Sequence, residues 1–254
     1  LKFTSTRLWW GMLIGTIAVS APLALVGAAL AGRPINETTT PGLDDPATLR
    51  SIYTSGLSIA YILTLTIGII TMAGEFRHQT FTATALASPR RYRVVLAKLV
   101  TVSLIGAGYG VASVASSVLA ALPVVLVRGG SPHLTGDGVP RALALVVLAV
   151  ALWAVLGLGV GTLIRNQVVA LLVAVGVSFL AEPLLSFILQ LAGWGKVAQY
   201  LPSTATSALI SPSAESGNLT LTYLPWWGAA LVLLGYAAVS GGIGAALTLR
   251  RDIT

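Results

Sequence analysis

The chain has 254 residues, of which 56% are hydrophobic and only 9% are charged, and its formal net charge is +7. A water-soluble domain usually carries about a quarter charged residues, so this composition excludes an ordinary soluble globular protein. The chain contains no cysteine, which excludes a disulfide framework, a thiolate metal site and a cysteine nucleophile.

The apolar residues come in blocks of about twenty or more, the length that a helix needs to cross a bilayer. These blocks predict an all-α membrane protein with six transmembrane helices in a single domain, residues 1–254. We expect the third helix to begin near Tyr92–Lys98 and to end at Pro123, because its block is too long for one upright span. In chain order, the expected spans are about 8–31, 51–73, 94–127, 142–163, 168–192 and 225–249.

Lysine and arginine predict the orientation, because the short inner loops of membrane proteins are enriched in them. With both termini in the cytoplasm, the inner segments hold Lys2, Arg7, Arg77, Arg90, Arg91, Arg93, Lys98, Arg165, Arg250 and Arg251. The outer segments hold Arg33, Arg50, Arg128, Arg141 and Lys196. This inner excess predicts a multi-pass protein of the cell membrane, and it accounts for the net positive charge without nucleic acid as a partner.

The longest inner segment, GEFRHQTFTATALASPRRYR at 74–93, lies between the second and third spans. Thr80 can cap a short helix over 81–87, which Ser88 and Pro89 would stop. The arginines that follow are expected at the lipid headgroups: Arg90, Arg91 and Arg93. A bare turn needs only a few residues, so the length of this segment suggests a docking element. The alternative is a basic hairpin that only follows the enrichment of Lys and Arg in inner loops.

The segment before the sixth span is partly apolar, and PSTATSALISP within it predicts a short helix. Ser203 can cap the start of this helix, and Ser211-Pro212 would stop it. The flanking aromatic residues are typical of a membrane interface: Trp194, Tyr200, Trp226 and Trp227. We expect an interfacial or re-entrant hairpin on the outer face, with an ordinary loop as the alternative.

The sequence offers no constellation for catalysis. His78 and His133 fall on opposite sides of the expected membrane, so they cannot share a metal. The pair Gly195-Lys196 is followed by Val197 and lacks the preceding glycine of a phosphate-binding loop, and no nucleophile elbow or zinc-protease motif appears. We therefore expect a chain that is not an enzyme and that binds no metal or cofactor itself.

Glycine is abundant inside the expected spans, in pairs separated by three residues. Small residues let helices approach closely in lipid, so these pairs predict helix packing within the chain, with a seam between two chains as the alternative. The pairs are Gly11/Gly15, Gly106/Gly110 and Gly157/Gly161.

Glu182, followed by Pro183, is the ionisable residue that stands out within the fifth span. A carboxylate at the bilayer centre costs about 2.5–3.5 kcal/mol on insertion scales. One interpretation is a gate or substrate contact beside a proline-kinked helix. The other is a carboxyl near the outer interface, or one that caps the backbone that Pro183 leaves free.

Gly-Glu-Phe-Arg-His-Gln-Thr after the second span, with Ser-Pro-Arg-Arg before the third, resembles the permease subunits of bacterial type-2 ABC exporters. In addition, KFTSTRLWW at 2–10 is similar to that family's amphipathic connecting helix, and YLPSTATSAL at 200–209 to its short outer helices. The resemblance implies that 75–93 carries the coupling helix, which docks on a cytoplasmic ATPase subunit. The docking residues that it implies are Glu75, Phe76, Arg77, His78, Thr80, Phe81 and Leu86.

The same resemblance implies an ATP-driven exporter, with ATP and Mg²⁺ held by the partner ATPase subunit. A second permease chain, the same or different, would complete the path, along which substrate moves outward. A secondary transporter would instead show inverted repeats and several buried ionisable groups. An intramembrane lipid-modifying enzyme would show polar residues clustered at one depth, and a membrane anchor would also use the inner segment.

Overall fold

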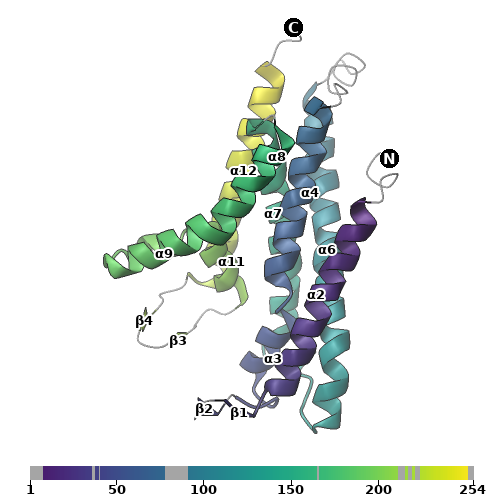
Figure 1. Ribbon diagram of the computed structural model, residues 1–254, viewed down its shortest axis with the longest axis vertical. Coiled ribbons are helices and arrows are strands. Elements are labelled where there is room, and N and C mark those ends of the chain that lie inside the picture. The colour runs from purple at the N-terminus through teal and green to yellow at the C-terminus, as the bar shows by residue number, and fades with distance from the viewer. Residues whose placement is uncertain are drawn as a thin grey trace.

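The computed structural model describes residues 8–35, 38–39, 41–77, 91–164, 166–210, 215–216, 219–220 and 224–250 (Figure 1). Five long helices lie in this part of the chain: α2 (Leu8–Leu30), α4 (Leu57–Arg77), α6 (Arg91–Val127), α7 (Val139–Leu163) and α12 (Trp226–Arg250). Shorter helices are α3 (Pro46–Tyr53), α8 (Gln167–Gly176), the π-helical turn η1 (Val177–Ala181), α9 (Glu182–Leu191), α10 (Gly195–Ala198) and α11 (Pro202–Ile210). Two antiparallel pairs of very short strands complete it: β1 (Pro34–Ile35) with β2 (Thr38–Thr39), and β3 (Glu215–Ser216) with β4 (Leu219–Thr220).

Within these residues, six helical segments are long and apolar enough to cross a membrane. They are Trp9–Leu30, Pro46–Gly74, Leu96–Val127, Val139–Leu163, Gln167–Leu191 and Trp226–Ile243. Each overlaps one expected span, so the prediction of a helical chain with six potential spans is confirmed. The chain therefore has the build of a multi-pass membrane protein.

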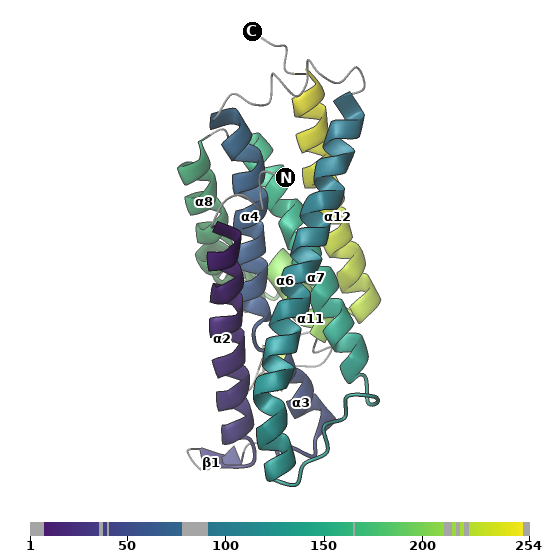
Figure 2. The same ribbon diagram turned by 90° about the vertical axis from the view of Figure 1, so that its right-hand side faces the viewer.

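α7 lies at the centre of the bundle, with α4, α6 and α12 packed along it, and α2 packs mainly against α6 (Figures 1 and 2). In its most apolar stretch 67% of the residues are buried, against 22% for α2 and for the α8–α9 segment. The end of α4, the start of α6, the α7–α8 junction and the end of α12 share one end of the bundle, upper in Figure 1. α3 and the α6–α7 connection lie at the opposite end, and α9 leaves the bundle at a steep angle.

Glycines set the closest helix contacts, as their spacing predicted for two of the three pairs. A β-carbon on Gly106 or Gly110 would lie 2.8 Å from the α7 backbone. One on Gly157 would collide with the carbonyl oxygen of Leu65 in α4, and one on Gly161 would lie 2.8 Å from that of Ile69. Gly11 differs, because nothing lies within 4 Å of a β-carbon built on it.

The expected end of the third span at Pro123 is wrong. α6 continues through Pro123 to Val127, since a proline removes one backbone donor but leaves the following residues free to stay helical. The helix stops at Gly129, which has a φ of +74°. The N–H of Gly130 then bonds to the carbonyl of Val125 at 2.9 Å, the bond that closes a helix when a glycine takes the left-handed conformation.

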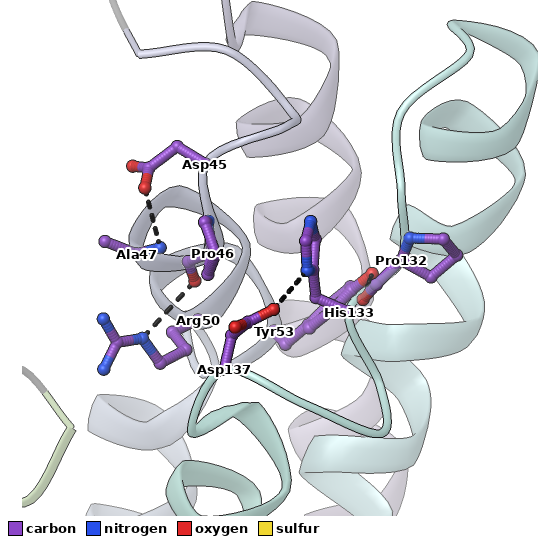
Figure 3. Close-up of polar contacts among 8 residues, drawn as sticks. All are labelled: Asp45, Pro46, Ala47, Arg50, Tyr53, Pro132, His133 and Asp137. Carbon is purple, nitrogen blue, oxygen red and sulfur yellow. Dashed lines mark hydrogen bonds and ion pairs between the residues drawn. The ribbon is translucent and has the colours of Figure 1, made fainter.

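The second expected span is divided into α3 and α4 by a turn over Thr54–Gly56. Asp45 caps α3, because its carboxylate accepts the N–H group of Ala47 at 3.2 Å (Figure 3) and that of Thr48 at 3.1 Å. These bonds hold the pKa of Asp45 below its ordinary value. At the turn, Gly56 leaves no room for a side chain beside Ser20 and Ser113.

The same end of the bundle carries a turn of the α6–α7 connection, drawn in Figure 3. His133 and Asp137 both have positive φ, at 47° and 54°, and the Nδ1 of His133 lies 2.6 Å from a carboxylate oxygen of Asp137. The hydroxyl of Tyr53 donates to the carbonyl of Pro132 at 3.3 Å. This turn is therefore held both by its own side chains and by α3.

Candidate functional site

The fifth apolar segment is not a continuous α-helix, because a π-helical turn interrupts it just before Glu182 and Pro183. The N–H of Glu182 bonds to the carbonyl of Val177, five residues back. A proline inside a helix lacks a donor and crowds the carbonyl four residues before it, and the wider turn accommodates this. Such π-turns are frequent at functional sites, and here one turns α9 away from α8 (Figure 1).

Glu182 is only 7% exposed although it lies in a segment apolar enough to span a membrane. Its Oε2 accepts the backbone N–H of Ser203, at the start of α11, over 2.8 Å. A helix N-terminus carries unpaired N–H groups and a partial positive charge, so a carboxylate is a fitting partner. Glu182 therefore joins the start of α9 to the start of α11. Ser203 is not in the cap position expected for it, because α11 already begins at Pro202.

A second contact fixes α11 to the centre of the bundle. The indole Nε1 of Trp153 in α7 donates to the hydroxyl of Thr206 at 2.9 Å, and this hydroxyl donates to the carbonyl of Pro202 at 2.7 Å. The Trp153 ring stacks on Tyr61 of α4, with centroids 4.4 Å apart. α11 is thus bonded to α7 and to α9 through two different side chains.

Between α9 and α11 lies an open groove with a volume of about 340 Å³. We call it the α9–α11 groove. Its lining residues from α9 are Pro183, Ser186, Phe187 and Gln190, and from α11 Ser203, Thr204 and Ser207. None of them carries a charge, and the carboxyl of Glu182, which adjoins Pro183, bonds to Ser203 at the edge of the groove.

The described part of the chain contains no group of three or more His, Cys, Asp and Glu residues that could hold a metal ion. His133 instead pairs with Asp137 in the α6–α7 turn. Among the described side chains, the arrangement around Glu182 offers a carboxylate already engaged with a helix start and a set of neutral hydrogen-bonding groups. Such a set can bind a ligand and can move with α9 and α11.

Much of the sequence-predicted docking segment falls outside the described residues. Glu75, Phe76 and Arg77 form the end of α4, and Arg91 and Arg93 lie in the first turns of α6, but the side chains of these five are not described. The remaining predicted residues lie outside the description altogether: His78, Thr80, Phe81, Leu86 and Arg90. Their roles stay predictions.

No protein-family model and no curated protein matches this chain. The family resemblance therefore rests on the sequence segments quoted above.

Sequence reasoning singled out Glu182 and Pro183 from their type and position, and the structure places them at the break in the segment. It did not find Trp153, Tyr61 and Thr206, whose residue types are unremarkable at helical spacing. A polar Thr206 within the predicted interfacial helix was the available signal, but its partner lies 53 residues away.

Proposed function

We propose that the chain is the transmembrane subunit of an ATP-driven exporter, powered by separate cytoplasmic ABC ATPase subunits. The observation that carries the proposal is the segment 74–93, whose sequence resembles the coupling segment of type-2 ABC exporter permeases. The end of α4 and the start of α6, which this segment connects, lie at the same end of the bundle as the end of α12 (Figure 1). A partner bound at that end would meet three of the long helices.

In this proposal the chain crosses the cell membrane with both termini in the cytoplasm. α11 is a short re-entrant helix on the outer side, before the last span. The path forms between this chain and a second permease chain, the same or different. ATP and Mg²⁺ belong to the ATPase subunits, and Arg90, Arg91 and Arg93 hold the docking segment at the lipid headgroups.

The packing of α4 on α7 supplies a physical route for the coupling. A β-carbon on Gly68 or Gly157 would collide with the backbone of the facing helix, so α4 cannot shift without moving α7. α7 holds α11 through Trp153 and Thr206, while α9 holds α11 through Glu182. A movement that starts at the end of α4 would thus reach the outer helix, with the π-turn before Pro183 as the hinge of a gate.

Co-purification tests the proposal. The tagged chain is extracted in mild detergent from its native host, and its stoichiometric partners are identified. We expect a P-loop ATPase with the wild-type chain, and its loss with Phe81→Asp. Thr135→Asp, which adds the same charge to an exposed residue at the opposite end of the bundle, is the matched control and should keep the partner.

Intact, folded protein that brings no nucleotide-binding partner and no ATPase activity would overturn the proposal. That outcome would favour a secondary transporter or an intramembrane lipid-modifying enzyme instead. Loss of the ATPase from both variants alike would show that 75–93 is not the specific contact.

A further inference from the structure

The α9–α11 groove has hydrogen-bonding capacity that the described part of the chain does not use. Ser186 accepts a bond from the side-chain nitrogen of Gln190 at 3.1 Å, but its own O–H has no acceptor there. The hydroxyl of Thr204 and the side-chain oxygen of Gln190 make no bond within the described residues. Ser207 donates to the carbonyl of Ser203 at 3.1 Å and keeps its capacity to accept. Donors and acceptors therefore both face the same space.

Unused polar groups beside a segment this apolar need a partner. α9 belongs to a segment apolar enough to span a membrane, and a polar group surrounded by hydrocarbon loses several kcal/mol when it has no hydrogen bond. Phe187 is 52% exposed and lines the groove beside these groups. A pocket that combines an aromatic surface with a few convergent polar groups is the usual form of a small-ligand site.

The charges around the groove restrict the ligand. Neither Lys nor Arg is among its lining residues, so nothing there would neutralise a phosphate or a carboxylate. The buried Glu182 carboxyl adjoins the lining at Pro183 and Ser203, and it adds no positive charge that would attract an anion. A quaternary ammonium group offers no donor or acceptor to Thr204 and Gln190. Hydroxyl groups satisfy all the conditions, because each one both donates and accepts and carries no charge.

The outer surface of α9 supplies the apolar half of the recognition. Its large side chains Leu184, Leu185, Ile188 and Leu191 are each at least 45% exposed, and they continue directly from the residues that line the groove. A ligand whose hydroxylated part lies in the groove can therefore place a hydrocarbon chain along α9, in the lipid phase. Polar head and apolar tail then match two adjoining surfaces.

From these observations we propose that the α9–α11 groove binds a lipid with a neutral, polyhydroxylated headgroup, of the glycolipid type. The headgroup hydroxyls bond to Thr204, Gln190 and Ser186, with the sugar face against Phe187. The inference concerns binding alone and does not rest on the proposed transport function.

Native mass spectrometry tests this proposal on the full chain. The protein is released from mixed micelles that contain monoglucosyl diacylglycerol, phosphatidylcholine and phosphatidylglycerol with matched acyl chains, and bound lipids are counted. We expect the wild-type chain to retain the glucosyl lipid in preference to both phospholipids. This comparison between headgroups uses the wild-type chain, so it does not depend on the folding of any variant.

A double variant then locates the site. Thr204→Val with Gln190→Leu should lower the glucosyl lipid affinity about tenfold, because each lost hydrogen bond contributes roughly 0.5–1.5 kcal/mol. Thr101→Val with Gln167→Leu removes the same groups outside the groove and should leave the affinity unchanged. Equal retention of all three lipids by the wild-type chain would overturn the proposal, as would a groove variant that binds the glucosyl lipid as tightly as the control variant.

Discussion

The carboxylate of Glu182 and the backbone N–H of Ser203 form a hydrogen bond of 2.8 Å, although 21 residues separate them in sequence. The bond joins the first residue of α9 to the second residue of α11. It gives the carboxyl a partner within a segment apolar enough to span a membrane, because the first N–H groups of a helix have no acceptors within that helix. The position of α11 therefore depends on a side chain of the preceding span.

Glu182→Ala should destabilise the protein by about 1–3 kcal/mol, because it removes the acceptor of the half-buried Ser203 N–H. Glu182→Gln should lose less stability, since its amide oxygen can still accept the hydrogen bond from the Ser203 N–H. Thermal unfolding in detergent measures both. The control is Asp44→Ala, which removes a carboxyl from an exposed position. Equal melting temperatures for Glu182→Ala and the control would show that the bond does not hold α11.

Trp153 and Thr206 should be coupled energetically. Trp153→Phe keeps an aromatic ring against Tyr61 but removes the indole donor, and Thr206→Val removes the acceptor. A double-mutant cycle on the free energy of unfolding should give a coupling of about 0.5–1.5 kcal/mol. Additive effects of the two changes would contradict the hydrogen bond between α7 and α11.

Gly157→Ala should strongly destabilise the bundle, because the added methyl group would collide with the Leu65 carbonyl. The matched control is Gly108→Ala in α6, where nothing lies within 4 Å of the added carbon. There the change should be neutral or stabilising by up to about 1 kcal/mol, since alanine favours a helix over glycine. Melting temperatures that fall equally for the two variants would argue against the close α4–α7 contact.

The cap at Asp45 should give the stability a dependence on pH. The backbone N–H of Ala47 and the hydroxyl of Thr48 hold the pKa of Asp45 below its unfolded value. Its contribution is therefore complete above the ordinary carboxyl pKa of about 3.9, and it is lost as the pH falls through the lower folded value.

Melting curves of wild type and Asp45→Ala over a pH series check this sign. The difference in melting temperature should be constant near neutral pH and should shrink in the acid range. Asp44→Ala serves as the comparison at an exposed neighbour. A difference that grows as the pH falls would contradict the assignment.

The number and places of the apolar helices were predictable because block length and hydropathy are local properties of the sequence. The break between α3 and α4 was not, and at Pro183 the sequence predicted a kink but not its π-helical form. Thr54–Gly56 and the π-turn Val177–Ala181 lie within apolar stretches, and they depend on packing and on Pro183 rather than on composition. At Pro123 the sequence predicted a helix end that the structure does not have, because the helix ends at Gly129 and not at the proline.

In the candidate site, Glu182 was predictable from the sequence, because a carboxyl group within an apolar span is energetically costly. Its partner is a backbone group, so no side-chain pattern in the sequence could identify Ser203 as the residue that it contacts. The α9–α11 groove likewise arises only when two helices meet. Hydroxyl side chains on both helices, and one amide on α9, are common enough in sequence to carry no signal alone.

Site-specific cross-linking tests whether a cytoplasmic ATPase docks on the segment 75–93. Because the chain has no cysteine, Phe81→Cys introduces a unique thiol, and Thr135→Cys places one at the opposite end of the bundle. In native membranes treated with a thiol-reactive cross-linker, we expect Phe81→Cys to trap a P-loop ATPase and Thr135→Cys to trap none. Failure of Phe81→Cys to trap any nucleotide-binding protein, in membranes where the chain is intact, would contradict the account.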